Sequence, residues 1–126
     1  MAELYAQAGQ ARRPGAALDD DTRRAARAFL RRLDRRYAVR DAFLFGSRAR
    51  GAHRVDSDAD IAVVLNGARG DRLAAALDMA GIAFDVLLET GVLVEALPLW
   101  EGELSHPEQF SNPALIQAIV REGVRL

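Results

Sequence analysis

The chain has 126 residues and no cysteine, so it can bury one hydrophobic core but can form neither disulfide bonds nor thiolate metal sites. Its net charge is -1, and all 17 basic residues are arginine, which excludes a P-loop lysine and a Schiff-base lysine. We expect a cytoplasmic protein without a membrane span, because no apolar run is long enough to cross a bilayer and residues 1–10 lack the pattern of a secretory signal.

The N-terminal part divides into an arm and the start of a domain. Residues 1–18 show no regular period and are predicted to form a loosely packed arm, whereas residues 19–126 are predicted to form one domain. Its first helix is expected over residues 20–37, because aspartates precede apolar residues that recur at helical spacing. Eight arginines fall between Arg23 and Arg40, and we interpret them as a solvated face rather than as a surface for RNA.

The middle of the chain predicts strands and helices in alternation. Short apolar runs that end at turn residues predict strands over residues 42–45 and 61–65. A short helix is expected over residues 71–80, and the apolar run after Gly81 predicts a third strand over residues 82–88. A helix over residues 92–97 is expected to stop before a proline.

The C-terminal part begins with a predicted polar loop over residues 101–111. Asn112 as N-cap and Pro113 at the first helical position predict a last helix that closes at Gly123. The fold class is therefore α/β or α+β, with a small mixed sheet flanked by helices.

Two aspartates at the start of the second strand carry the clearest chemical signal. Asp58 and Asp60 are two residues apart, so their side chains point to the same face of a strand. Two ionised carboxylates this close raise each other's pKa unless a divalent cation neutralises them. Oxygen ligands without cysteine or chelating histidines favour Mg²⁺, which also accepts oxygens from a substrate phosphate.

Asp85 is the natural third ligand. It lies within the apolar run predicted as the third strand, where an acid is costly to bury unless it is paired or binds a metal. Glu89 is a rival but adjoins a turn and is expected to be solvated. Three carboxylates holding two ions about 3.5 to 4 Å apart would match the arrangement of polymerase-type enzymes.

The turn after the first strand is the predicted phosphate site. Gly46 lets the backbone approach a ligand, and Ser47 adds a hydroxyl donor beside backbone N–H groups that can point at an anion. Arg48, Arg50 and Arg54 are close enough in sequence to reach phosphate oxygens, and the choice among them stays open.

These residues together resemble a known signature. Gly46 and Ser47 are followed, after ten residues, by Asp58 and Asp60, and this pattern is similar to that of the polymerase-beta-like nucleotidyltransferases. The short chain, the acid at Asp85 and the ending over residues 121–124 resemble the MNT-type minimal nucleotidyltransferases. The resemblance covers residues 20–126.

The resemblance implies an activity and a partner. MNT-type proteins are typically antitoxins encoded beside HEPN-type ribonuclease toxins, and some transfer AMP from ATP to a tyrosine of the toxin. The chain would then bind ATP and Mg²⁺, act as a protein adenylyltransferase and form a complex with the toxin. Two alternatives stay open, namely a small-molecule adenylyltransferase acting on an antibiotic and a catalytically silent antitoxin that acts by binding alone.

Three further residues are expected to lie outside the active site. His53 lies in a polar loop, where a surface imidazole is the commoner finding, although it could touch phosphate or act as a base. His106 and Trp100 are interpreted as loop packing rather than site residues. The tryptophan could also contribute to a partner surface.

Overall fold

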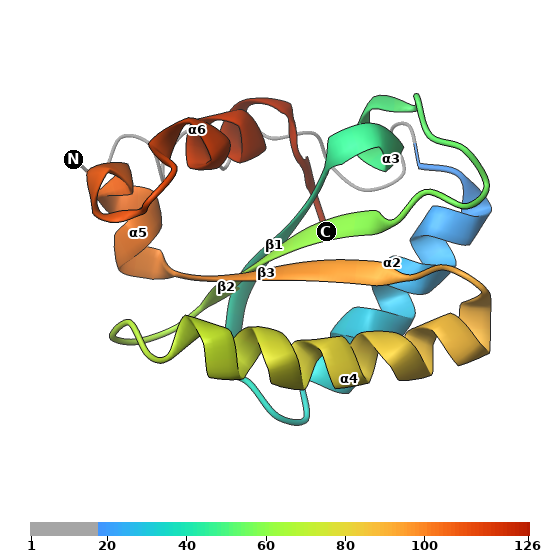
Figure 1. Cartoon of the computed structure of the whole chain (residues 1–126), viewed down its shortest axis with the longest axis horizontal. Helices are drawn as coiled ribbons and strands as arrows, with labels where there is room; N and C mark the ends of the chain where they lie inside the picture. The colour runs from blue at the N-terminus through green and yellow to red at the C-terminus, as the bar shows by residue number, and fades with distance from the viewer. Residues whose placement is uncertain (1–17) are drawn as a thin grey trace.

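The computed structural model describes residues 18–126, so the predicted arm, except Leu18, lies outside the described residues. The domain predicted for residues 19–126 contains helices on both sides of one sheet (Figure 1). In chain order the elements are α2 (Asp20–Leu33), β1 (Val39–Phe45), α3 (Gly46–Arg50), β2 (Ala59–Leu65), α4 (Arg72–Thr90), β3 (Val94–Trp100), α5 (Glu101–Ser105), the 3-10 helix η1 (Pro107–Gln109), α6 (Pro113–Glu122) and β4 (Val124–Arg125).

The sheet has four strands in the order β3-β2-β1-β4. β1 is antiparallel to both β2 and β4, whereas β2 and β3 are parallel, so the sheet is mixed as predicted. The long helix α4 makes the crossover between the two parallel strands. Because β3 is at one edge, its outer side has no neighbouring strand within the described chain.

Helices cover both faces of the sheet, as the side chains of β2 illustrate. Ile61 and Val63 belong to a core shared with α2 and α4, whereas the alternating Ala62 and Val64 belong to a second core shared with α5 and α6. Successive strand residues point to opposite faces, so a strand buried on both sides is apolar throughout. This explains the continuous apolar run in β2.

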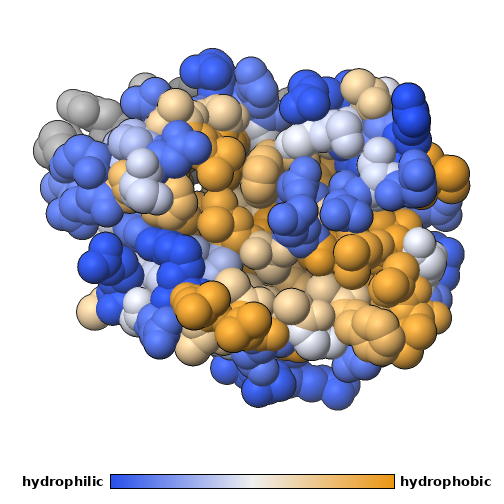
Figure 2. Space-filling model, viewed as in Figure 1, coloured by the Kyte–Doolittle hydropathy of each residue, from blue (hydrophilic) through white to orange (hydrophobic). Residues whose placement is uncertain are grey.

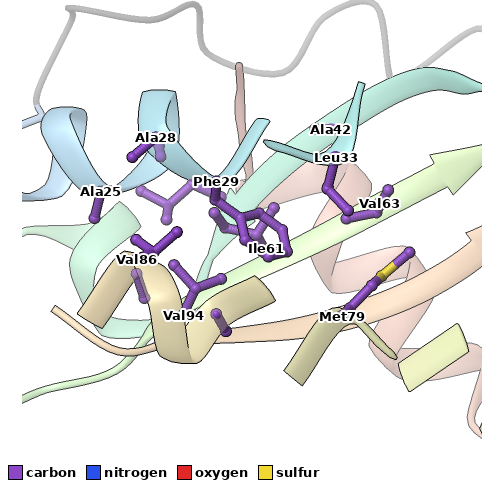
Figure 3. Close-up of a cluster of buried hydrophobic side chains, with 14 of the residues drawn as sticks. Ala25, Ala28, Phe29, Leu33, Ala42, Ile61, Val63, Met79, Val86 and Val94 are labelled. Carbon is purple, nitrogen blue, oxygen red and sulfur yellow. The ribbon is translucent and has the colours of Figure 1, made fainter. Parts of the chain in front are cut away.

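The core beneath α2 and α4 is the larger one. Figure 3 shows Phe29 and Leu33 of α2 and Met79 and Val86 of α4 in one buried cluster with Ile61 of β2. Each of these five side chains is fully buried. Burying an apolar side chain of this size contributes about 1.5 to 3 kcal/mol, so this layer fixes the two helices against the sheet.

Two predicted elements are wrong. The run over residues 82–88 is the second half of α4, not a strand, and residues 92–97 lie mostly in β3, not in a helix. The prediction fails at Gly81, which is taken as a helix break but lies inside α4. The position has room for a side chain, because nothing lies within 4 Å of an added Cβ. An apolar run flanked by a glycine has no period that separates a strand from a helix.

Several other predictions are confirmed. Strands occur at residues 42–45 and 61–65, and the first helix begins at Asp20 but ends at Leu33, four residues early. The last helix has its N-cap at Asn112, whose side chain accepts a hydrogen bond of 3.3 Å from the backbone N–H of Leu115. The predicted loop over residues 101–111 also contains α5 and η1. No helix within residues 18–126 is long and apolar enough to cross a membrane.

Candidate active site

Three acidic residues lie at one end of the sheet. Asp60 lies near the start of β2, where it pairs with Phe45 of β1 on one side and with Glu95 of β3 on the other. Residues in register on neighbouring strands point to the same face, so Asp60 and Glu95 share the face that α6 covers farther along the sheet. Asp58 precedes Asp60 by two residues. We call Asp58, Asp60 and Glu95 the acidic cluster.

Glu95 was missed by the sequence prediction. The helix expected over residues 92–97 placed it outside the sheet, whereas β3 aligns it with Asp60. The available signal was the alternation of Glu95 with the apolar Val94 and Ala96 in a short run that ends at a tryptophan.

The acidic cluster is electrostatically unfavourable without a counter-ion. Partial burial, followed by the negative charges of Glu95 and Asp58, raises the pKa of the half-buried Asp60 above its ordinary value. Arg50 opposes this shift, which places its positive charge near the carboxylate. Asp58 and Glu95 are exposed, so the cluster opens to solvent and to any substrate.

Gly46 lies directly against Asp60. The residue adopts a φ of +75°, a left-handed conformation that favours glycine, and an added Cβ would collide with Oδ2 of Asp60. The structure therefore requires glycine here because the Asp60 side chain approaches the backbone, while contact between this backbone and a phosphate stays a prediction. No other residue type fits here without moving the Asp60 carboxylate.

Gly46 and Ser47 form the first turn of the short helix α3, which follows β1 without a loop (Figure 1). The half-buried Ser47 accepts a hydrogen bond of 3.0 Å from the N–H of Ala52 at its carbonyl. α3 thus stands at the same end of the sheet as the acidic cluster. A phosphate group held near Gly46 and Ser47 would be close to Asp60.

Arg48, predicted to contact phosphate, is instead turned into the protein. Its side chain is 2% exposed and donates hydrogen bonds to the carbonyl of Ser57 at 2.9 Å, the hydroxyl of Thr22 at 2.8 Å and the carbonyl of Val55 at 3.2 Å. A guanidinium with its donors engaged in this way is not available to a substrate. Arg48 instead anchors the loop before Asp58 to α2.

Arg50 remains the candidate for phosphate binding. It is exposed, acts on Asp60 and lines a pocket of about 150 Å³ between α3 and α6, together with Gly46, Leu115 and Glu122. Arg54 is also exposed, and its backbone N–H donates to the Ser57 hydroxyl at 2.9 Å.

Asp85, predicted as the third ligand, lies outside the cluster. It is on α4 rather than on a strand, its side chain is 58% exposed, and its Oδ2 lies 3.9 Å from a guanidinium nitrogen of Arg32. Glu89, its rival, forms ion pairs with Arg31 at 3.2 Å and with Arg32 at 3.0 Å. Both acids therefore connect α4 to α2. The acid beside Asp60 in the sheet is Glu95.

A groove leads from the acidic cluster along α4. It has a volume of about 410 Å³, and its polar residues are Asp58 and Glu95. The remaining lining is apolar and comes from α4, β3 and the residue before it: Ala76, Ala80, Ala83, Leu93, Val94 and Ala96. An extended or apolar group could lie here with one end at the carboxylates.

The remaining candidates lie elsewhere. The half-buried His53 has Nε2 at 3.5 Å from a carboxylate oxygen of Asp19. His106 contacts Glu108 at 3.3 Å, and Trp100 is buried at the end of β3 as part of the larger core. Trp100 is therefore a core residue of a strand rather than a loop residue.

The donor set fits a hard divalent cation. No three histidine, aspartate or glutamate side chains within residues 18–126 already converge on a metal position. Mg²⁺ needs only one or two protein carboxylates, however, because water and substrate phosphates complete its shell. Asp58, Asp60 and Glu95 supply only oxygen atoms. The pKa of Asp60 is raised first by burial and then by the charges of Glu95 and Asp58, and a bound cation would offset that repulsion.

Comparison with known proteins identifies a family for this chain. The sequence model of the nucleotidyltransferase domain family matches residues 26–125, a range that includes α3 and the acidic cluster. Among solved structures, a candidate nucleotidyltransferase from Sulfolobus solfataricus is 23% identical, with a TM-score of 0.45 over 71% of this chain and 82% of that one. No curated protein matches the chain.

Proposed function

Because this chain belongs to the nucleotidyltransferase domain family, we propose that it transfers AMP from ATP to a hydroxyl group at the acidic cluster. The observation that carries the proposal is the placement of Asp60, which lies between Glu95 and Gly46 with Arg50 nearby. This arrangement puts negative side chains for a cation beside a backbone turn and a positive side chain for phosphate.

In this proposal, one group of residues binds the triphosphate and another binds the metal. Gly46 and Ser47 would approach the triphosphate with backbone and hydroxyl groups, and Arg50 would pair with a phosphate oxygen. Asp58, Asp60 and Glu95 would hold Mg²⁺, which neutralises the triphosphate and lowers the pKa of the acceptor hydroxyl.

The transfer of AMP needs no reactant other than ATP and the acceptor hydroxyl. The acceptor oxygen forms a bond to the α-phosphorus of ATP, the bond from that phosphorus to the bridging oxygen breaks, and pyrophosphate leaves. The hydroxyl proton passes to a carboxylate of the cluster or to water. The side chains thereby position both reactants and stabilise the charge that develops.

We extend the proposal to a protein acceptor, a tyrosine of a HEPN-type ribonuclease toxin, for which the chain would be the antitoxin. Support comes from the exposure of Asp58 and Glu95, which leaves the site open on one side, and from the MNT-type pattern of the sequence. A small-molecule enzyme needs a pocket that encloses most of its substrate, whereas the groove here is open. A protein partner would supply the missing wall.

Such a modification would inactivate the toxin durably. An AMP group on a tyrosine near the ribonuclease centre adds a bulky anion, which repels the phosphates of RNA. One antitoxin molecule could modify many toxin molecules in turn. The antitoxin would then act in less than equal amount.

The test uses the purified chain, a HEPN-type ribonuclease toxin as the proposed acceptor, ATP and Mg²⁺. Intact-mass spectrometry of the toxin should show additions of one AMP group, and these should disappear with Asp58→Asn. Asp85→Asn is the matched control, because it removes the same charge from α4 outside the cluster. Additions should persist with that variant.

The same experiment separates the alternatives. A toxin that stays unmodified but is inhibited in a stable stoichiometric complex would favour a silent antitoxin and contradict the enzymatic proposal. Transfer of AMP to an aminoglycoside, with no protein modified, would favour a small-molecule enzyme and contradict only the protein acceptor.

A further inference from the structure

Helix α4 is apolar on two opposite faces. Its inner face packs Met79, Ile82 and Val86 into the larger core. Its outer face carries four large side chains that are between 55% and 70% exposed: Leu73, Leu77, Phe84 and Leu88. We call these four residues, with Ala80 and Gly81 between them, the outer stripe.

The outer stripe is a continuous apolar surface rather than a set of scattered residues. Spacings of four and seven residues place Leu73, Leu77, Phe84 and Leu88 on one side of a helix. Figure 2 shows apolar side chains gathered over α4. A contiguous apolar patch that is exposed on a helix face in this way marks an interaction site.

The stripe is symmetric about its centre. Leu73 and Leu88 lie equally far from the midpoint between Ala80 and Gly81, and so do Leu77 and Phe84. If a second α4 packs antiparallel with its own midpoint at the same place, each Leu73 faces Leu88 and each Leu77 faces Phe84. Every large apolar residue then meets another, as a two-fold symmetric interface requires.

The centre of the stripe suits a helix crossing. Ala80 and Gly81 are both exposed, and nothing lies within 4 Å of an added Cβ at Gly81. Helices pack with their axes about 8 to 10 Å apart, and small residues at the crossing permit the closer end of this range. Two copies could therefore approach at Ala80 and Gly81 while the larger side chains interlock on either side.

We propose that the outer stripe of α4 joins two copies of this chain in an antiparallel, two-fold symmetric dimer. This inference goes beyond the proposed function and does not depend on it. Ala80 belongs both to the outer stripe and to the lining of the groove that contains Asp58 and Glu95. The second copy would therefore border the open side of that groove.

The first test measures the mass of the full-length chain by sedimentation equilibrium, up to about 100 μM, a range that detects association of moderate strength. We expect twice the mass of one chain. Phe84→Glu should lower the association constant by about 100-fold or more, because each copy then buries a charge without a partner. Val55→Glu is the matched control, since Val55 is 85% exposed but lies outside α4, and it should remain dimeric.

A second test uses the absence of native cysteine to check the register. Ala80→Cys should form a disulfide-linked dimer on mild oxidation, because the two copies of residue 80 meet at the symmetry axis. Leu73→Cys alone should not, because its two copies would lie about 22 Å apart along the helices. Leu73→Cys combined with Leu88→Cys should again crosslink.

The results that would overturn the proposal are equally definite. A monomeric wild-type chain would mean that another protein, or the chain's own residues 1–17, covers the stripe. A dimer that survives Phe84→Glu would mean that the interface lies elsewhere. Equal crosslinking of Ala80→Cys and Leu73→Cys would exclude the antiparallel register, and this test does not require the variants to be active.

Discussion

The carboxylate of Asp60 occupies the space that a side chain on Gly46 would need. The two residues come from different elements, the start of α3 and the start of β2, and the left-handed backbone at Gly46 lets them approach. A candidate phosphate-binding turn and a candidate metal ligand are thereby in direct contact.

Gly46→Ala should therefore impair nucleotide transfer more than it impairs folding. The methyl group would displace the Asp60 carboxylate, and a misplacement of about 1 Å can lower a rate by about 100-fold. The left-handed φ adds a stability cost of about 1 to 2 kcal/mol. Gly67→Ala is the control, because Gly67 has a φ of +90° with nothing within 4 Å of its Cβ. Transfer rates and urea unfolding of both variants separate the two effects, and equal rates would contradict the role of the contact.

Neutralising Glu95 should lower the rate of AMP transfer, whereas neutralising Asp85 should not. Glu95→Gln removes a carboxylate in register with Asp60 and should lower the transfer rate by about 100-fold or more. Asp85→Asn removes an exposed carboxylate paired with Arg32 and should leave the rate unchanged. The measurement is steady-state AMP transfer at saturating Mg²⁺ and ATP. Loss of activity in Asp85→Asn alone would return the third-ligand role to Asp85.

Asp60→Asn should abolish transfer and raise the melting temperature of the metal-free protein. The folded state raises the pKa of Asp60, so its ionised form opposes folding at neutral pH, and a neutral amide removes this cost. Mg²⁺ with ATP should stabilise the wild-type protein strongly and this variant weakly, since ligands stabilise the state that binds them. Thermal unfolding with and without EDTA measures both effects. An ATP-induced shift that EDTA does not reduce would contradict the metal site.

Replacing Arg48 should lower stability, whereas replacing Arg50 should lower the transfer rate, although the two residues are only two positions apart. Arg48→Met leaves the Thr22 hydroxyl and the Ser57 carbonyl without their donor, and it should destabilise the fold by about 3 kcal/mol. Arg50→Met alters an exposed side chain, so stability should change by less than about 0.5 kcal/mol. Its transfer rate should nevertheless fall. Chemical denaturation and ATP titration of the two variants provide the measurements, and a stable, inactive Arg48→Met would reverse the assignment.

Tyr37 should ionise at unusually high pH. Burial, followed by the hydrogen bond of 2.6 Å that its hydroxyl donates to Asp78, raises its pKa to about 12. Because the folded-state pKa exceeds that of the unfolded chain, this contribution to stability is complete below about pH 10 and is lost as the pH rises towards 12. Tyrosinate absorbance during alkaline titration should show this late step, and Tyr37→Phe should remove it. A single step near the ordinary tyrosine pKa would contradict the contact.

The sequence alone determined the parts of the site that depend on local spacing. Gly46, Ser47, Asp58 and Asp60 lie within fifteen residues, and their spacing predicts two neighbouring aspartates, although only Asp60 lies in β2 and Asp58 precedes that strand. The strands around them and the cap at Asn112 were also predictable, because short-range rules govern apolar runs, turns and helix starts. The fold class, a small sheet flanked by helices, was also predictable, although the third strand and the helix after it were placed wrongly.

The tertiary structure decided what depends on distant contacts. Residues 82–88 are apolar because α4 contacts the core on one side and presents the outer stripe on the other, so their pattern has no period that identifies a helix. The third carboxylate depends on the register of two parallel strands joined by that helix, which brings Glu95 beside Asp60 and leaves Asp85 on the far side of α4 from β3, against α2. The direction of Arg48 likewise depends on Thr22, a residue 26 positions away. Spacing along the chain cannot encode such contacts, since they exist only after the helices have packed on the sheet.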